Sequence, residues 1–211
     1  MTPTLKVIKD LRFRMPQIRD QGSRPLCLAF AGSDFNSAQN NTTVPLSVEF
    51  LAYHAYQVDG HSNYSDGLTT NSIAVSLANV GQPTESTMPY CQSASSPQTP
   101  PSALGHRFYS HATHSSSFIH SIDSQLNADK PTVICIKLCR SFLNLSAPFM
   151  LDHVNGHVAN HAIVVVGSAL SNVSEKYYLI RNSWGPAWGD GGHCWLSESY
   201  IKTTAYALLE G

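Results

Sequence analysis

The sequence is poor in charged residues. Only 13% of its 211 residues are Asp, Glu, Lys or Arg, and the formal net charge is −1. Its 10 histidines are scattered along the chain rather than gathered in one region. Because neither sign of charge dominates, the composition predicts no basic surface of the kind that binds nucleic acid. We therefore expect no nucleic-acid partner.

The sequence also lacks a long apolar run. No stretch approaches the roughly 20 apolar residues that a membrane-spanning helix needs, so we expect no membrane partner. Residues 1–17 lack the apolar core and the small-residue cleavage site of a secretory signal. We expect a soluble protein that is cytoplasmic or is delivered by a leaderless secretion route.

Cysteine is scarce, since the chain has 5 of them and at least one must stay unpaired. Cys135 and Cys139 lie four residues apart in the β-branched run TVICIKLC, so in a strand they share one face. A metal site is one interpretation of this pair. Without a partnering Cys/His pair elsewhere, we instead expect buried structural thiols, and no metal or organic cofactor.

Three distant segments carry residues that fit one chemistry. Cys27 lies 134 residues before His161, and Asn182 follows that histidine by 21 residues. A thiol becomes a strong nucleophile when an imidazole takes its proton and a third group orients the imidazole. The order predicts Cys27 as a nucleophile, His161 as the base and then the acid, and Asn182 as the orienting group. His157 is the alternative base, but His161 is the histidine that starts an apolar run.

Motifs around these residues resemble those of the papain-like (C1) cysteine peptidases, and the resemblance covers nearly the whole chain. They are Gln21-Gly22 before Cys27, then Asn182-Ser183-Trp184-Gly185, and Trp188-Gly189-Asp190-Gly191-Gly192. The resemblance implies an α+β fold of two lobes, with the active-site cleft between a helical left lobe and a β-barrel-like right lobe. We expect one domain over 1–211, with a helical lobe at about 15–104. The β-rich lobe would take 105–211 together with the N-terminal segment.

The resemblance also implies roles for further residues. Gln21 would donate its side-chain amide to the oxyanion beside the backbone N–H of Cys27. Trp184 would cover the hydrogen bond between His161 and Asn182. Substrate-binding roles are implied for Gly67, Ala162, Trp188, Pro25 and Leu26. Pro25 and Leu26 stand where relatives have small residues, so we expect a narrow first specificity pocket that favours Gly or Ala before the scissile bond.

Two departures from the family pattern concern regulation. Relatives carry a half-cystine three residues before the nucleophile and another near residue 66, and this chain has Arg24 and Asp66 there. The missing disulfide framework suits a reducing compartment. Residues 1–15 are also too few for an inhibitory pro-segment. We therefore expect a protein or peptide substrate, a proteinaceous inhibitor or immunity protein as a candidate partner, and a role as a microbial effector or toxin protease.

The residue pattern predicts helices in the first half and strands in the second, which favours an α+β protein. Residues 91–105 are rich in Ser and Pro and are interpreted as the crossing between lobes. Helices are predicted from Cys27, after the N-cap Ser47, over 71–80 before Gly81, and over 118–128 after Ser117. Strands are predicted at 132–138, 161–167, 176–182 and 192–197.

The predicted activity is that of a cysteine endopeptidase that forms an acyl-enzyme. A thiol acyltransferase or a glutamine deamidase would share the cysteine and histidine pair on the same scaffold, and stays an alternative. The other alternative is an inactive peptide-binding homologue, although all four expected catalytic positions are intact.

Overall fold

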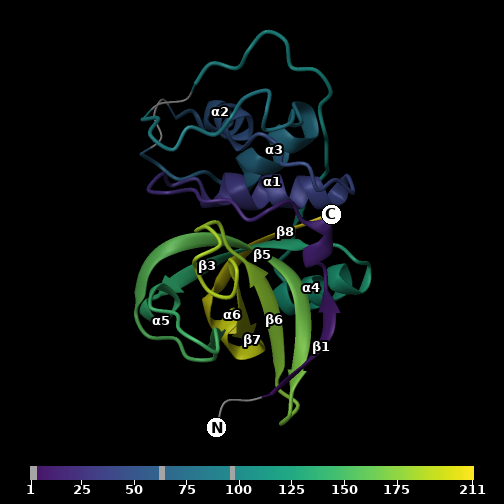
Figure 1. The fold of residues 1–211 in the computed structure, drawn as a ribbon, viewed down its shortest axis with the longest axis vertical. Helices are drawn as coiled ribbons and strands as arrows, with labels where there is room; N and C mark the ends of the chain where they lie inside the picture. The colour runs from purple at the N-terminus through teal and green to yellow at the C-terminus, as the bar shows by residue number, and fades with distance from the viewer. Residues whose placement is uncertain (1–3, 62–64, 96–97) are drawn as a thin grey trace. The chain divides into compact units, whose positions relative to one another are not determined.

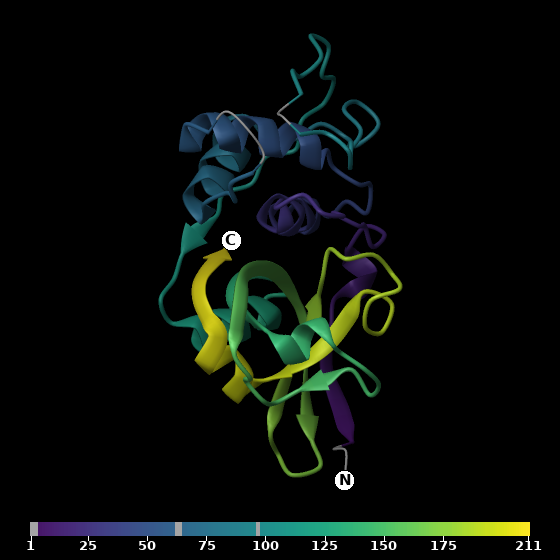
Figure 2. The same ribbon diagram turned by 90° about the vertical axis from the view of Figure 1, so that its left-hand side faces the viewer.

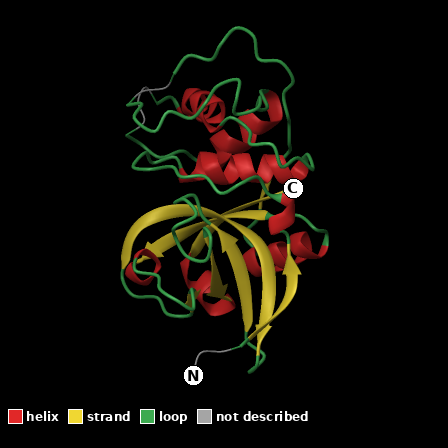
Figure 3. Ribbon diagram, in the orientation of Figure 1, coloured by secondary structure: helices red, strands yellow, loops and turns green. Residues whose placement is uncertain are grey.

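The computed structural model describes residues 4–61, 65–95 and 98–211. These residues divide into two compact units. The helical unit consists of residues 14–17, 21–113 and 211, and the sheet unit consists of the chain up to Phe13 with 18–20 and 114–210. In Figure 3 the red helices α1 to α3 belong to the helical unit, while the large yellow sheet belongs to the sheet unit.

Three helices form the helical unit: α1 (Cys27–Gln39), α2 (Val48–Asp59) and α3 (Thr70–Asn79). The predicted N-cap of α2 is confirmed, because the Ser47 hydroxyl accepts a hydrogen bond from the Phe50 backbone N–H at 3.1 Å. Thr69 caps α3 in the same way. Large apolar side chains fill the core of this unit, including Phe30, Phe35, Phe50, Leu51 and Tyr56.

The sheet unit is built on strands in the order β2-β8-β3-β5-β6-β7-β4, with β1 added alongside β5. The strands are β1 (Leu5–Asp10), β2 (Thr113–His114), β3 (Thr132–Cys139), β4 (Met150–Leu151), β5 (His157–Ser171), β6 (Lys176–Arg181), β7 (His193–Ser197) and β8 (Ala205–Glu210). Strand β5 pairs antiparallel with β1, β3 and β6, and the pairs β3–β8 and β6–β7 are antiparallel too, whereas β4 and β7 run parallel. The long strand β5 bends strongly along its length (Figures 1 and 2).

Strand β5 changes partner along one edge. Residues 157–165 pair with β3. Further along β5, at the same edge, residues 167–171 pair with β1. Gly167 stands at this change, where an added Cβ would lie 2.5 Å from the Lys9 carbonyl oxygen. The absence of a side chain therefore lets β1 approach β5 closely.

Short helices pack on this sheet: α4 (Phe118–Asn127), α5 (Arg140–Leu143) and α6 (Glu198–Thr204), while the 3₁₀ turn η1 (Arg12–Arg14) follows β1. Ser117 precedes α4 as predicted, but its side chain makes no capping hydrogen bond. Ser197 caps α6 by accepting from the Tyr200 backbone N–H.

The α+β prediction is confirmed, and each predicted helix and strand has a counterpart. The sequence did not predict β1, β2, β4, β8, α5 or α6, and β5 is longer than the predicted strand at 161–167. The predicted crossing at 91–105 includes residues 96 and 97, which lie outside the described residues. Cys135 and Cys139 are buried, as expected of structural thiols, and neither forms a disulfide. Among the described residues, no helix combines the length and the apolar character that a membrane crossing requires.

We predict that Gly167→Ala destabilises the protein. An added methyl group would meet the Lys9 carbonyl at 2.5 Å and the Leu179 Cβ at 3.2 Å, so β1 must shift away from β5. We expect the free energy of unfolding to fall by about 1–3 kcal/mol in urea denaturation. The matched control is Gly67→Ala, where an added Cβ meets nothing within 4 Å. Equal stability of the two variants would contradict this account of β5.

Candidate active site

His161 and Asn182 form a buried hydrogen-bonded pair in the sheet unit. His161 lies in β5 and is 5% exposed, and Asn182 directly follows β6 and is 3% exposed. The His161 Nε2 and the Asn182 Oδ1 are 2.7 Å apart. The structure thus brings two of the predicted site residues into direct contact.

The register of the sheet explains this meeting. The last pair between β5 and β6 joins Val164 to Arg181. Continued past that pair, the antiparallel register would bring Trp184 opposite His161. The pairing with β5 stops at Arg181, but pairing with β7 goes on: the Asn182 backbone N–H donates to the Gly192 carbonyl at 3.0 Å, which continues the Arg181–His193 pair. Asn182 is thus held on the β7 side while its side chain reaches His161.

Hydrogen bonding also fixes the tautomer of His161. The Ser183 backbone N–H donates to the Asn182 Oδ1 at 2.8 Å, which identifies that atom as the oxygen of the side chain. An oxygen can only accept, so the His161 Nε2 carries a hydrogen and donates it. In the neutral ring the Nδ1 is then the acceptor. A proton taken from a nucleophile would therefore go to Nδ1.

Aromatic rings enclose the histidine. Trp184 lies against His161, with ring centroids 4.7 Å apart. Phe142 of α5 meets Trp184 edge-on at 5.6 Å and stacks on Trp188 at 4.9 Å. The predicted covering position of Trp184 thus has a geometric basis. Sequence reasoning missed Phe142, because it lies in a four-residue helix with no readable periodicity.

Burial lowers the pKa of His161 to about 4, while its hydrogen bond to Asn182 raises it. The neutral imidazole is therefore the form that this pocket favours by itself. A negative charge beside Nδ1 would stabilise the protonated ring and raise its pKa. The pocket thus suits a base that becomes charged only together with an anion.

Cys27 is the first residue of α1 and is partly exposed. The first N–H groups of a helix have no partner within the helix, and the helix dipole places partial positive charge there. Both effects stabilise negative charge at the start of a helix in general. Gln21 is buried, and its side-chain amide donates to the Arg24 carbonyl at 2.8 Å. Both residues belong to the helical unit.

The predicted substrate-binding residues differ in exposure. Gly67 and Pro25 are exposed, and Trp188 is partly exposed. Leu26 is 0% exposed and packs inside the helical unit, while Ala162 is buried in β5 opposite Cys135. Pro25 and Gly67 are therefore the members of this set that solvent reaches most easily.

The alternative base has a weaker setting. His157 is exposed at the start of β5, and its Nε2 lies 3.3 Å from the Asn160 Oδ1. It lacks the short bond and the aromatic cover that surround His161. The geometry therefore favours His161 as the base.

Comparison with known proteins identifies the family of this chain. A family model described as papain family cysteine protease matches residues 8–207. The chain belongs to this family. Chymopapain from Carica papaya is 24% identical to it over 183 residues, which are 83% of this chain and 50% of chymopapain. The chain thus spans about half the length of this papain-family relative, and shorter matches to others cover 11% to 19% of those proteins.

Solved structures of papain-family proteins share the fold. Xylellain, a cysteine protease from Xylella fastidiosa, gives a TM-score of 0.80 at 21% identity, covering 99% of this chain and 89% of that chain. A cysteine protease of Carica candamarcensis in complex with E-64 gives 0.72 at 20% identity, covering 98% and 97%. The predicted papain-like fold and the family resemblance are confirmed.

A second buried histidine lies next to the site. His193 stands where papain-like sequences commonly have Tyr, and it pairs with Arg181 between β7 and β6. Its Nδ1 donates to the Gly191 carbonyl at 3.0 Å. Burial, followed by the charges of Arg181 and Arg12, lowers the pKa of His193 to about 4. The folded chain therefore keeps this ring neutral at neutral pH.

We predict that His193 makes the fold acid-sensitive. The unfolded chain protonates it near its ordinary pKa of about 6.5, so its contribution to stability is present above that pH and is lost as pH falls toward 4. When the pH is lowered from about 7 to about 4.5, the free energy of unfolding should fall in both proteins. The fall should be about 2 kcal/mol smaller in His193→Gln than in wild type. Denaturation at both pH values measures this. His157→Gln, which changes an exposed histidine, is the control, and an unaltered pH dependence in His193→Gln would contradict the prediction.

Proposed function

We propose that this chain is a cysteine endopeptidase that hydrolyses peptide bonds through Cys27 and His161. The observation that carries the proposal is the His161–Asn182 pair, whose hydrogen bond leaves Nδ1 to take the thiol proton. Membership of the papain family and the position of Cys27 at the start of α1 support it. The mechanism requires that the Cys27 thiol and the His161 imidazole meet.

The proposed reaction runs in two halves. The proton of the Cys27 thiol passes to His161 Nδ1, and the thiolate sulfur attacks the carbonyl carbon of the scissile bond. The oxyanion accepts hydrogen bonds from the backbone N–H of Cys27 and from the Gln21 amide. As the C–N bond breaks, the imidazolium gives its proton to the leaving amine, which leaves an acyl-enzyme. Water then attacks the thioester, with His161 taking one of its protons and returning it to the sulfur.

Asn182 orients the imidazole through both halves. Its oxygen accepts from Nε2 whether the ring is neutral or charged, so the ring need not rotate when Nδ1 gains or loses its proton. Trp184 and Phe142 keep water from competing for that bond. The aromatic cover thus serves the same orientation.

Labelling with the epoxide inhibitor E-64 and intact mass spectrometry provide the first test. We expect the wild-type protein to gain one inhibitor mass and Cys27→Ala to gain none, because only an activated thiolate opens the epoxide rapidly. Cys91→Ala, which removes another partly exposed thiol, is the matched control and should label as wild type does. Hydrolysis of peptide substrates by the wild type should fall to background in Cys27→Ala.

Absence of labelling in folded wild type, or labelling that persists in Cys27→Ala, would sink the proposal. Labelling together with release of ammonia from glutamine side chains, without cleavage of any peptide, would instead assign a deamidase. Transfer of the acyl group to an amine without hydrolysis would assign a thiol acyltransferase.

We further propose that the first specificity pocket is narrow. Pro25 is exposed two residues before the nucleophile, and its ring occupies space that a small residue would leave open. A peptide library should show Gly or Ala before the scissile bond, and Pro25→Gly should raise the relative kcat/KM for larger residues by about tenfold. Pro101→Gly, an exposed proline elsewhere in the helical unit, should leave the preference unchanged. A wild-type preference for large or basic residues would overturn the assignment.

The effector or toxin role, the proteinaceous inhibitor and the cellular location stay predictions from the sequence. The one-domain organisation over 1–211 does so as well.

A further inference from the structure

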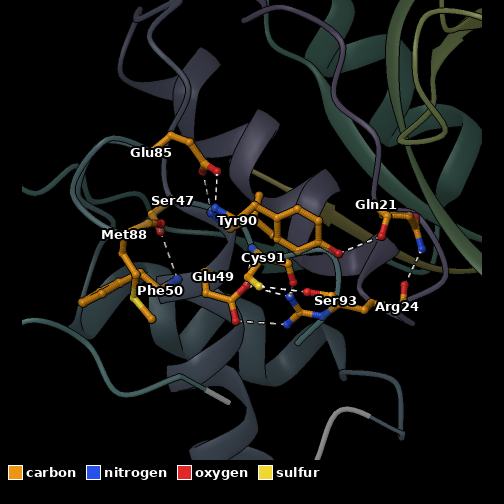
Figure 4. Close-up of polar contacts among 11 residues, drawn as sticks. Gln21, Arg24, Ser47, Glu49, Phe50, Glu85, Met88, Tyr90, Cys91 and Ser93 are labelled. Atoms are coloured by element: carbon orange, nitrogen blue, oxygen red, sulfur yellow. Dashed lines mark hydrogen bonds and ion pairs between the residues drawn. The ribbon is translucent and has the colours of Figure 1, made fainter. Parts of the chain in front are cut away.

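A buried ion pair in the helical unit joins Arg24, three residues before the start of α1, to Glu49 of α2. The Arg24 Nη1 lies 2.7 Å from Glu49 Oε2, and the Nη2 lies 3.1 Å from Glu49 Oε1. The two side chains are 5% and 0% exposed. Figure 4 shows the guanidinium facing the carboxylate with two parallel contacts. This is the bidentate geometry in which an arginine loses the least freedom for each hydrogen bond formed.

Two further contacts hold the same guanidinium. Its Nη1 also donates to the Cys91 backbone carbonyl, and its carbon lies 4.8 Å from the centre of the Tyr90 ring. The Glu49 carboxylate in turn accepts from the Cys91 backbone N–H at 3.4 Å. The arginine side chain is therefore fixed by α2 on one side and by the segment at 90–91 on the other.

The backbone of Arg24 connects this anchored side chain to Gln21, the predicted oxyanion donor. The Arg24 carbonyl accepts from the Gln21 side-chain nitrogen at 2.8 Å and from the Leu26 backbone N–H at 2.8 Å. An amide nitrogen carries two N–H groups in one plane, so holding one of them sets the direction of the other. One carbonyl thus sets both the Gln21 amide and the residue directly before Cys27.

Tyr90 holds Gln21 at a second point. Its hydroxyl donates to the Gln21 backbone carbonyl at 2.7 Å, as Figure 4 shows, and its backbone N–H donates to Glu85 Oε1 at 2.7 Å. Its ring also meets Phe30 of α1 edge-on at 4.9 Å. The backbone and the side chain of Gln21 are therefore anchored to the same structure that surrounds the arginine.

We propose that Arg24 and Glu49 are positioning residues, which act through Gln21 to preorganise the oxyanion hole. The inference rests on the proposed function and extends it to residues that do not touch the substrate. None of the five cysteines, all of them in the described part of the chain, forms a disulfide, so this loop is held by a buried ion pair rather than by a covalent cross-link. Its geometry consequently does not depend on the redox state of the surroundings.

Stability alone does not account for this pair. Replacing a buried ion pair by apolar residues of similar volume is often neutral or stabilising, whereas removing one partner leaves a buried charge uncompensated. An apolar pair would still fill the space, but it would not anchor the Arg24 backbone at defined hydrogen-bonding points. Geometric precision at Gln21 is therefore the property that distinguishes the ion pair from its apolar substitutes.

The test replaces both charges at once with Arg24→Met/Glu49→Leu. We expect kcat for a peptide substrate to fall by at least about tenfold while KM changes by less than about twofold, because the lost interaction acts on the transition state. The melting temperature should stay near that of wild type. The matched control, Glu198→Leu/Lys202→Met, removes the partly exposed pair on α6 and should leave kcat unchanged. If the double replacement does not fold, Arg24→Lys, which keeps the charge but loses the fork, should show the same fall in kcat.

A double-mutant cycle with Gln21→Ala separates positioning from a general structural effect. Gln21→Ala should lower kcat by about 100- to 1000-fold, as loss of one oxyanion donor does. In that background, Arg24→Met/Glu49→Leu should cost no more than about twofold further, because its effect passes through the missing amide. The inference would be overturned if Arg24→Met/Glu49→Leu lowered kcat by the same factor with and without Gln21→Ala. It would also be overturned if the double replacement left kcat unchanged when Gln21 is present.

Hydrogen exchange gives a readout that does not require peptidase activity. The Leu26 amide donates to the Arg24 carbonyl, so its exchange should be at least about tenfold faster in Arg24→Met/Glu49→Leu, while amides inside α2 stay protected. If the wild type hydrolyses no peptide but the double replacement still speeds the exchange of the Leu26 amide, the proposed function is refuted and the anchoring stands. Equal protection of Leu26 in both proteins would refute the anchoring itself.

Discussion

The sheet unit depends on the antiparallel pairing of β5 with three other strands. Along one edge it pairs first with β3 and then with β1, and along the other it pairs with β6 only as far as Val164. Beyond Val164, β6 no longer pairs with β5, so side chains rather than a paired strand lie along this edge of β5 around His161. The side chains of Asn182 and Trp184 meet His161 there, while the Asn182 backbone stays paired on the β7 side. The early end of one strand pair thus creates the room in which the histidine and its partners lie.

The setting of His161 and that of Cys27 complement each other chemically. A dry aromatic pocket disfavours a charged imidazole, and the start of a helix favours a thiolate. Under the proposed function, neither charge is stabilised fully by its own surroundings. Each becomes favourable when the other is present, so proton transfer is linked to formation of the pair. This coupling explains why a base with so low a pKa by itself can still serve at neutral pH.

Sequence reasoning succeeded where the signal is local. Ser47 predicted the start of α2, because an N-cap is decided by residues within one turn. Phe142 and the polar start of β5 were missed, because a four-residue helix has no periodicity and residues 157–160 are exposed rather than alternating. The partner of Arg24 was missed as well, because Glu49 is 25 residues away and nothing local marks the contact. Contacts between distant segments are set by the packing of whole elements, which a single sequence does not display.

The two parts of the proposed machinery are held by different means, and catalysis gives a reason. Under the proposed function His161 gains and loses a proton, and the neutral Asn182 amide can orient it without fixing it in the charged state. Gln21 stays neutral throughout, so it can be anchored by the full charges of Arg24 and Glu49. Those charges must also cancel, because an unpaired Glu49 would oppose the oxyanion that forms beside Gln21. A bidentate arginine meets both conditions, since it holds the loop at two points and pairs the Glu49 charge.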